Sequence, residues 1–281
     1  MEDQVGPELG FGWAVGDAFN QIGGSSTASV EELELDSDKK VVLLKVAWGG
    51  KSLAVDFRPP SSGGTTGPYY KSFIENIKVT MATLGHIFPK EATDRKVVLS
   101  GFAWHQGWND GCNKTMAEEY EKNLANLIRD VRKDLNTPDL PFAIAGTGML
   151  GYEKDPGSSK PHEEDGYFRR EDIVKAELKV ATYPEFKGTV TTIDTRPYAR
   201  KAYPASPSDQ NYHWMRNAES YWLIGQSLGN AMNLLVNQRE QRQASTLTAT
   251  TDEQRSTAPL MGWRSWNQYG ANITQEIMQQ S

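Results

Sequence analysis

Short hydrophobic runs alternate along the chain with segments whose apolar residues have a helical spacing. The runs cover residues 41–48, 97–104, 140–147 and 188–194; they are rich in Val, Ile, Leu and Phe or in Thr, and are bounded by Gly, Pro or charged residues. Runs of this kind are typical of buried strands. The pattern therefore predicts four strands, each followed by a helix.

Four helices are expected from apolar positions that recur at intervals of three and four residues. They cover residues 70–84, 120–135, 170–183 and 218–236. Thr115 and Glu118 stand in capping-box register before the second of them, and that helix should end before Pro138. The alternation predicts an α/β fold with a mostly parallel sheet and helices on both faces. In such sheets ligands bind beyond the carboxyl ends of the strands.

Composition narrows the class of protein. The 281 residues include 30 Lys and Arg against 36 Asp and Glu, a net charge of −6, which argues against a nucleic-acid partner because such binding needs clustered cations. No apolar run approaches the roughly 20 residues that span a bilayer, so no membrane partner is expected. The single cysteine, Cys112, excludes an internal disulfide, and four scattered histidines lack a zinc spacing. The sequence also has no Gly-x-Gly-x-x-Gly and no Walker loop, so we expect no metal and no cofactor.

Candidate chemistry follows the first two strands. Gly49 and Gly50 end the first strand, where glycines let backbone N–H groups approach a ligand closely, as an oxyanion hole requires. A plain tight turn is the alternative. The second strand delivers an imidazole, two amides, two indoles and a carboxylate within seven residues: Trp104, His105, Gln106, Trp108, Asn109 and Asp110. Trp104 alone would be a core residue and His105 alone a structural histidine, but the cluster favours a binding site.

A third segment combines an acid with a histidine. Asp209 precedes His213 by four residues in a loop that enters the last helix. Such an acid holds an imidazole in one tautomer for general-base chemistry. A helix-entry Asp with a surface His nearby is the alternative. The other histidines, His86 and His162, belong to no cluster and are expected to be solvated.

These segments together resemble the SGNH-type carbohydrate esterases, in particular the sialate O-acetylesterase-like group that includes acetylxylan esterases. The motifs that carry the resemblance are residues 6–10, 47–53, 102–110 and 209–213, within a match of about residues 5–236. The resemblance implies a three-layer α/β/α sandwich and hydrolysis of acetyl esters on sugars. In that family a serine attacks the ester carbonyl, a histidine accepts its proton, an acid orients the histidine, and Gly and amide donors bind the oxyanion.

The resemblance assigns roles to four residues. His213 corresponds to the general base, Asp209 to its orienting acid, and Gly50 and Gln106 to the oxyanion donors. Substrate binding is expected from Trp48, Trp104, His105, Trp108, Asn109 and Asp110. The chain departs from the family pattern in two ways. Trp108 stands where many relatives have Glu, and the gap from acid to histidine is four residues rather than three, so that Asn211 or Asp110 are alternative orienting residues.

The nucleophile is the larger departure. In the family it follows an N-terminal strand, in a Gly-Gln-Ser-Asn or Gly-Asp-Ser turn upstream of the element that residues 6–10 match. Residues 1–20 contain no Ser or Thr, and the nearest hydroxyls, Ser25, Ser26 and Ser52, do not follow a strand in the expected motif. We therefore expect that the first strand is missing, that its apolar flanks are exposed, and that the chain as printed is inactive or nearly so.

Three regions are expected along the chain: an incomplete esterase domain at 1–236, a linker at 237–257 that is poor in large apolar residues, and a tail at 258–281. The tail resembles the opening strand of the family 27 α-galactosidase barrel and is expected to be disordered or loosely docked.

Two other functions remain open: a non-catalytic carbohydrate-binding protein that uses Trp48, Trp104 and Trp108, or a part of an α-galactosidase-containing, glycan-degrading protein. A polysaccharide substrate implies secretion, and Asn113 and Asn272 lie in glycosylation tripeptides, although the chain as written has no secretory signal.

Overall fold

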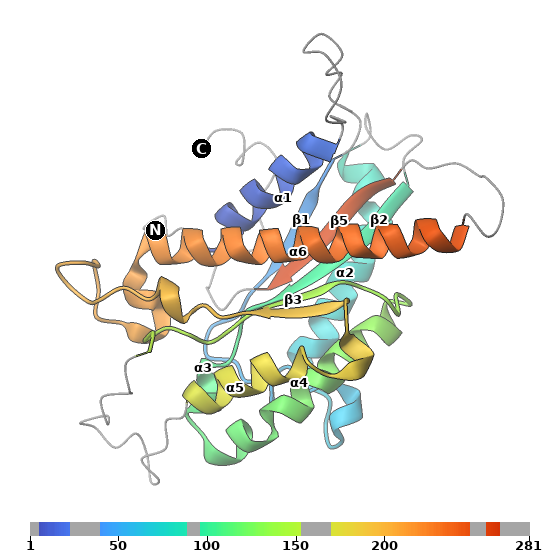
Figure 1. Cartoon of the computed structure of the whole chain (residues 1–281). Helices are drawn as coiled ribbons and strands as arrows, with labels where there is room; N and C mark the ends of the chain where they lie inside the picture. Colours follow the sequence, from blue (N-terminus) through green and yellow to red (C-terminus); the bar gives the residue numbers. More distant parts are fainter. Residues whose placement is uncertain (1–5, 23–39, 89–95, 153–169, 248–256, 265–281) are drawn as a thin grey trace.

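A parallel sheet forms the middle layer of the molecule. The computed structural model describes residues 6–22, 40–88, 96–152, 170–247 and 257–264. In this part the sheet has the strand order β1-β5-β2-β3-β4, with all neighbours parallel (Figure 1). Its strands are β1 (Val42–Val46), β2 (Lys96–Trp104), β3 (Phe142–Ala145), β4 (Val190–Ile193) and β5 (Thr257–Arg264).

Helices cover both faces of this sheet, which confirms the three-layer α/β/α sandwich (Figure 1). The helices are α1 (Glu8–Ile22), α2 (Pro68–Ile87), α3 (Trp108–Gly111), α4 (Lys114–Asp134), α5 (Arg170–Val180) and α6 (Ala218–Leu247). Short 3-10 turns lie at η1 (Pro60–Ser62), η2 (Pro184–Phe186), η3 (Arg196–Tyr198) and η4 (Asn211–Arg216). None of the helices in the described ranges is long and apolar enough to cross a membrane.

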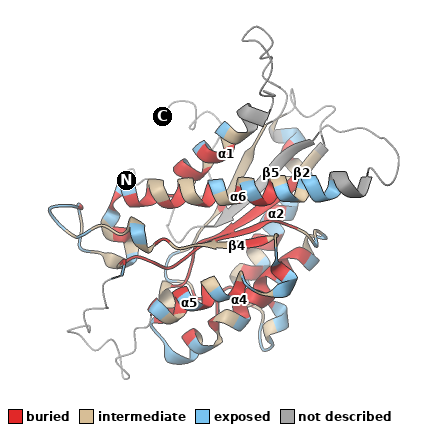
Figure 2. Ribbon diagram, in the orientation of Figure 1, coloured by how far each residue is buried: buried red, intermediate tan, exposed pale blue. Residues whose placement is uncertain are grey.

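The two faces of the sheet differ in the size of their side chains. Phe102 and Trp104 of β2 belong to the core beneath α2, α4 and α5, whereas Ala103 between them belongs to the core beneath α1 and α6. This alternation follows from the period of two residues in a strand. Figure 2 shows buried residues concentrated in β2 and β3 and on the neighbouring parts of the helices.

Small residues bring α1 and α6 into close contact. A Cβ atom added at Gly225 of α6 would lie 1.9 Å from the carbonyl oxygen of Pro7, and one at Gly10 of α1 would lie 2.4 Å from the carbonyl oxygen of Trp222. Both obstacles are backbone atoms, which cannot move out of the way as a flexible side chain does. Glycine is therefore required at this crossing because the two helix backbones touch.

Replacing Gly225 by Ala is expected to lower the free energy of unfolding by about 1–3 kcal/mol, since the added methyl group overpacks the helix crossing. Gly16 of α1 is the matched control, because nothing lies within 4 Å of an added Cβ there. Gly16→Ala should stabilise the protein by about 0.5–1 kcal/mol through helix propensity. Urea denaturation of both variants measures the effect, and equal stabilities would contradict the close crossing.

The boundaries expected for the helices need two corrections. The side chain of Asn113, not Thr115, caps α4, because its carboxamide oxygen accepts a hydrogen bond from the backbone N–H of Met116. Helix α6 continues to Leu247, so residues 237–247 of the expected linker are helical. Here polar contacts replace apolar ones: the guanidinium of Arg239 donates to the carbonyls of Leu99 and Ser100, and that of Arg242 donates to the carbonyl of Gly188.

The tail does not dock loosely where it is described. Thr257–Arg264 forms β5, which pairs with β1 on one side and with β2 on the other. The sheet thus has a strand, rather than a gap with exposed flanks, between β1 and β2. The ladder with β2 shifts register between Leu99 and Gly101, next to the pair formed by Val98 and Pro259; proline donates no ladder hydrogen bond, and such sites tolerate irregular pairing. Residues 265–281 of the tail lie outside the described residues.

A proline in the interior of β5 tests this placement. In a parallel sheet every N–H of an interior strand is directed to one neighbour or the other. Met261→Pro should therefore cost at least about 1–3 kcal/mol more than Met261→Ala, because a carbonyl of β1 or β2 loses its donor. Met261→Ala is the control, since it shortens the same side chain and keeps the N–H. Equal melting behaviour of the two variants would show that β5 does not belong to the sheet.

Candidate active site

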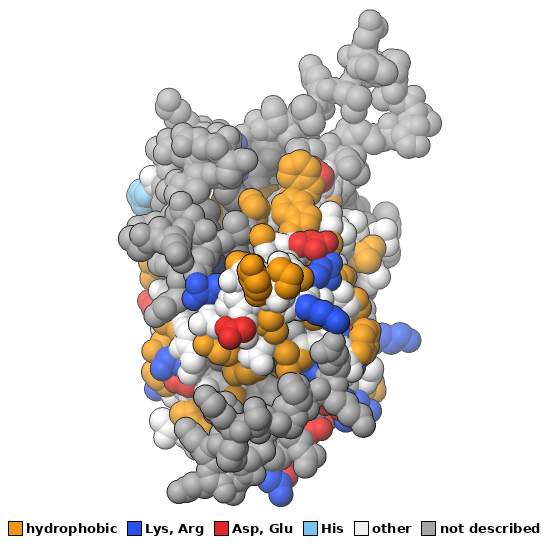
Figure 3. Space-filling model, turned by 90° about the vertical axis from the view of Figure 1, so that its left-hand side faces the viewer, with side chains coloured by type: hydrophobic (Ala, Val, Ile, Leu, Met, Phe, Trp, Pro, Cys, Tyr) orange, Lys and Arg blue, Asp and Glu red, His pale blue; other side chains and the backbone are white. Residues whose placement is uncertain are grey.

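The segments expected to carry chemistry meet at the carboxyl ends of the strands. The turn at Gly49 and Gly50 follows β1, residues 105–110 follow β2, and η4 lies beside them. Figure 3 looks onto this end of the molecule, where hydrophobic side chains gather in the middle of the face with charged side chains beside them. We call this end of the sheet the rim.

A buried carboxylate joins the ends of β1 and β2. Asp110 is fully buried, and its carboxylate accepts hydrogen bonds from the backbone N–H groups of Leu53 and Ala54, both at 2.9 Å. The side-chain amide of Gln106 donates to the same carboxylate at 2.7 Å and to the carbonyl oxygen of Lys51 at 2.9 Å. Burial raises the pKa of Asp110 to about 6. Gln106 and Asp110 therefore tie the segment after Gly50 to the end of β2.

Gly50 has the open position that an oxyanion donor needs. It is exposed, its φ is +66°, and nothing lies within 4 Å of an added Cβ. Space alone would admit a side chain there, but the left-handed backbone favours glycine. The turn after β1 thus leaves its backbone groups accessible at the rim.

The amide of Gln106 is engaged inside the protein, whereas that of Asn109 is not. Both N–H groups of Gln106 point to protein acceptors, so the structure offers no spare donor on this side chain. Asn109 is half-buried at the rim, and its side-chain amide makes no hydrogen bond with any residue in the described ranges. The amide of Asn109, which we assigned to substrate binding, thus has no acceptor within the described residues, unlike that of Gln106.

Three residues expected to contact substrate lie in the interior instead. Trp104 packs against Phe57 with ring centroids 5.6 Å apart, and Asp110 is enclosed by its donors. His105 is buried, its Nδ1 lies 3.0 Å from the carbonyl oxygen of Ala145, and burial lowers its pKa. These residues lie at the end of β2 and just after it, but the core and the polar groups around them enclose their side chains.

The indoles of Trp48 and Trp108 are half-buried and keep part of their surface exposed. Trp48 meets Tyr69 edge to face at 4.5 Å, and Trp108 lies 5.7 Å from the ring of Tyr212. Their assignment to substrate binding stays a prediction.

His213 lies in η4, beside the end of β2. The ring of the preceding residue, Tyr212, contacts Trp108, and the following residue, Trp214, has its ring 6.1 Å from that of His105. The carbonyl oxygen of His213 accepts a hydrogen bond from the hydroxyl of Tyr221 at 2.9 Å. The structure thus brings His213, Gln106 and the turn at Gly50 to the same rim.

None of the candidate orienting acids or amides is bonded to His213 in the described part of the chain. Asp209 is exposed, and no hydrogen bond or ion pair links it to His213. The carboxamide oxygen of Asn211 accepts from the backbone N–H of Tyr212, and Asp110 is held by the donors described above. A role for Asp209 requires a change in the conformation of its loop.

Glu177 is a further residue of the site that sequence analysis did not find. It is fully buried on α5 and accepts hydrogen bonds from the N–H and hydroxyl of Thr147 at 2.7 and 2.8 Å. The hydroxyl of Tyr120 donates to the carbonyl oxygen of Gln106 at 2.5 Å, so these groups form one polar network under the rim. The available signal was a carboxylate on the apolar face of the helix, four residues after Ile173.

The hydroxyls at the other strand ends are engaged inside the protein. Ser52 is buried and shares its hydroxyl with Asp56 and the N–H of Val55, and the hydroxyl of Thr195 donates to the carbonyl of Gly146. Ser25 and Ser26 lie outside the described residues. No group of three or more His, Cys, Asp or Glu in the described ranges is placed to hold a metal ion.

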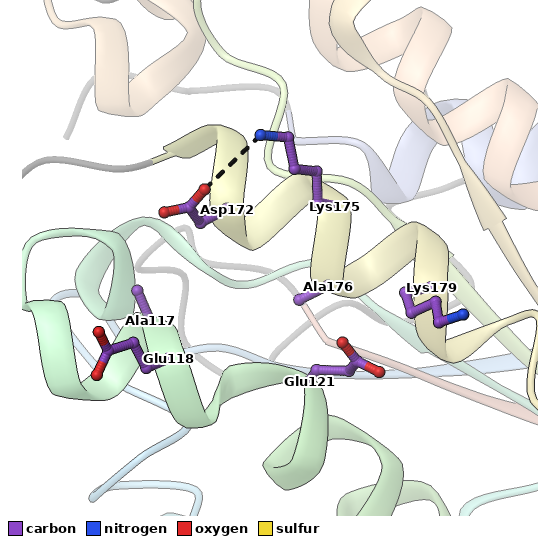
Figure 4. Close-up of a pocket in the computed structure, with 7 residues that line it drawn as sticks. All are labelled: Ala117, Glu118, Glu121, Asp172, Lys175, Ala176 and Lys179. Carbon is purple, nitrogen blue, oxygen red and sulfur yellow. Dashed lines mark ion pairs between the residues drawn. The ribbon is translucent and has the colours of Figure 1, made fainter.

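A separate groove of about 410 Å³ lies between α4 and α5 (Figure 4). Its lining residues are Ala117, Glu118, Glu121, Asp172, Lys175, Ala176 and Lys179. Figure 4 shows an ion pair between Asp172 and Lys175, and no residue expected to carry chemistry lines the groove. The rim, not this groove, is the candidate active site.

The chain matches a known family over residues 6–179, which is more than half of its length. The family is described as carbohydrate esterase, sialic acid-specific acetylesterase (SASA), and the chain belongs to it. The match includes the rim residues of β1 and β2 and ends before η4.

The chain also has a weak similarity to a solved structure. A protein from Arabidopsis thaliana with a known X-ray structure is similar at 17% sequence identity and a TM-score of 0.43, over 66% of this chain and 57% of that one. The chain therefore spans little more than half the length of that protein. No curated protein matches the chain.

Replacing Glu177 by Gln should reduce the pH dependence of stability. Burial raises the pKa of Glu177 to about 8, so the folded protein retains a proton that the unfolded chain releases near its ordinary pKa. Stability therefore falls as the pH rises from about 4.5 to about 8, by roughly 2–5 kcal/mol for this group. Gln resembles the protonated form and removes that loss.

Urea denaturation at pH 5 and pH 8 measures the difference. Glu171→Gln, an exposed carboxylate on the same helix, is the control and should leave the pH dependence unchanged. An equally steep loss of stability in Glu177→Gln and in the unmodified protein would contradict the buried, protonated state of Glu177.

Proposed function

We propose that the chain is a carbohydrate O-acetylesterase that hydrolyses acetyl esters on sugars by acyl transfer. Membership of the carbohydrate esterase family supports this class of reaction. The observation that carries the proposal is the joining of the Gly50 turn to the end of β2, next to His213, through Gln106 and Asp110.

The rim supplies two of the three parts that acyl transfer needs. Backbone N–H groups at Gly50 and the amide of Asn109 would bind the oxygen of the tetrahedral intermediate, and one such donor typically lowers the barrier by about 3 kcal/mol. His213 would accept the proton of the attacking group. Gln106 would act as an oxyanion donor only after giving up one of its two protein acceptors.

The third part, a nucleophilic hydroxyl, is not supplied by the strand-end residues Ser52, Thr147 or Thr195. We therefore propose that the chain as printed hydrolyses acetyl esters only slowly. Secretion and a polysaccharide substrate remain part of the proposal, and the exposed Asn113 lies in a glycosylation tripeptide.

A non-catalytic sugar-binding protein is the second candidate. The half-exposed aromatic rings of Trp48, Trp108 and Tyr212 at the rim favour it, because aromatic faces stack on sugar rings. The resemblance of residues 258–281 to an α-galactosidase supports a wider role in glycan degradation. Residues 257–264 themselves lie in the sheet of this fold rather than in a barrel.

Hydrolysis of 4-nitrophenyl acetate and of an O-acetylated xylan tests the esterase proposal. We expect a low rate that falls by about 10²-fold in His213→Ala, the effect of losing a general base. His86→Ala removes an exposed histidine at the end of α2 and should leave the rate unchanged. Labelling with a fluorophosphonate, followed by mass spectrometry, will show whether any serine is reactive. A rate that is independent of His213 would rule out the mechanism and favour sugar binding alone.

A further inference from the structure

The carboxylate of Asp110 is buried without a cation to balance it. Its hydrogen-bond donors are the N–H groups of Leu53 and Ala54 and the amide of Gln106, all of them neutral. A buried carboxylate costs free energy unless its oxygens are fully hydrogen-bonded. Both oxygens of Asp110 have donors, so the chain keeps this carboxylate at a place where it contacts no solvent.

Two of the three donors of Asp110 lie more than fifty residues away along the chain. Leu53 and Ala54 follow the Gly49–Gly50 turn, while Asp110 follows Asn109 in α3. The same carboxylate therefore joins the segment that follows the Gly50 turn to α3, the helix that carries Asn109. Gln106 adds a second link at the carbonyl of Lys51, the residue directly after Gly50.

We propose that Asp110 is a positioning residue that sets the distance between the Gly50 turn and the amide of Asn109, and so forms the cradle for the acyl oxygen. This role rests on the proposed function, since it concerns the same rim. Asp110 acts through its neighbours and touches no substrate, which replaces its expected role in substrate binding.

Asp110→Asn is the most informative substitution at this position because Asn preserves the shape of the side chain. One oxygen of Asp110 accepts two donors and the other accepts one. Whichever way the amide of Asp110→Asn is turned, its NH₂ group faces at least one donor. The turn after β1 should then separate from the end of β2.

Asp130 provides a matched control. It is also a buried carboxylate that holds a loop, since it accepts hydrogen bonds from the N–H and hydroxyl of Ser61 at 2.7 and 2.5 Å. It lies on α4 and binds η1, away from the strand ends. Asp130→Asn should therefore cost stability without changing the rim.

The first measurement is steady-state hydrolysis of 4-nitrophenyl acetate. Preorganised donors act on the transition state more than on the bound substrate. We therefore expect kcat to fall about tenfold in Asp110→Asn with KM changed less than about twofold, and both constants to stay within about twofold in Asp130→Asn. An equal loss of kcat in the two variants would overturn the proposal.

The second measurement does not depend on turnover. Acetate, the product anion, is titrated into ¹⁵N-labelled protein while the backbone signal of Gly50 and the side-chain signal of Asn109 are followed. Both signals should shift together in the unmodified protein and in Asp130→Asn, and the Gly50 shift should be lost in Asp110→Asn. Absence of these shifts in the unmodified protein, or their persistence in Asp110→Asn, would overturn the proposal.

Gln106→Met keeps the test valid if Asp110→Asn does not fold. It removes the link to Lys51 and leaves the two backbone bonds of Asp110 in place, so the acetate-induced shift at Gly50 should weaken. An unweakened shift would count against the proposal. Failure of the proposed function looks different: hydrolysis would be independent of His213, while acetate would still distinguish Asp110→Asn from Asp130→Asn.

Discussion

A carboxylate held by neutral donors is the interaction on which the geometry of the rim depends. Asp110 binds two successive backbone N–H groups after β1 and the amide that follows β2, and no solvent reaches it. Hydrogen bonds to a buried charge are stronger than those between neutral groups. The loss of any one donor would therefore leave the carboxylate less stabilised and weaken its link between the two segments. The two strand ends are thus coupled at their tips, in addition to their pairing with β5 on either side.

The second buried acid, Glu177, makes this coupling sensitive to protonation. Burial raises the pKa of Glu177 to about 8 and that of Asp110 to about 6, and the charge of Asp110 raises the pKa of Glu177 further. Between these values the pair holds one negative charge, on Asp110. The hydroxyl of Thr147 donates to the carboxyl group of Glu177 at 2.8 Å and lies 3.4 Å from the carbonyl oxygen of Gln106. Near neutral pH the charge of this network is therefore on Asp110, the residue that holds the segment after β1.

Apolar periodicity was enough to predict four of the five strands, the helices α2, α4, α5 and α6, and the edge of the sheet at which the candidate site lies. It failed where polar groups decide the structure. Helix α6 extends through a polar segment because Arg239 binds carbonyls of β2 and Arg242 binds the carbonyl of Gly188, and no local pattern contains those partners. Likewise the sequence showed that His105 and Asp110 follow a strand, but not that their side chains are buried. Burial depends on the residues that pack over them, and these are distant in sequence. The tail at 258–281 was assigned to the opening strand of another fold by resemblance alone. No local pattern predicts that residues 257–264 pair with β1 and β2, because the partners are distant in sequence.

The backbone of η4 supports the assignment of His213 independently of any resemblance. Trp214, Met215 and Arg216 follow it with φ of 53°, 54° and 55°, a left-handed conformation that costs non-glycine residues about 1 kcal/mol or more each. The surroundings impose this strain: Trp214 is buried, and the hydroxyl of Tyr221 holds the carbonyl of His213. Strained segments that persist in this way cluster at functional sites. The backbone of η4 thus places His213 at the rim, and Asp209 makes no hydrogen bond or ion pair with it.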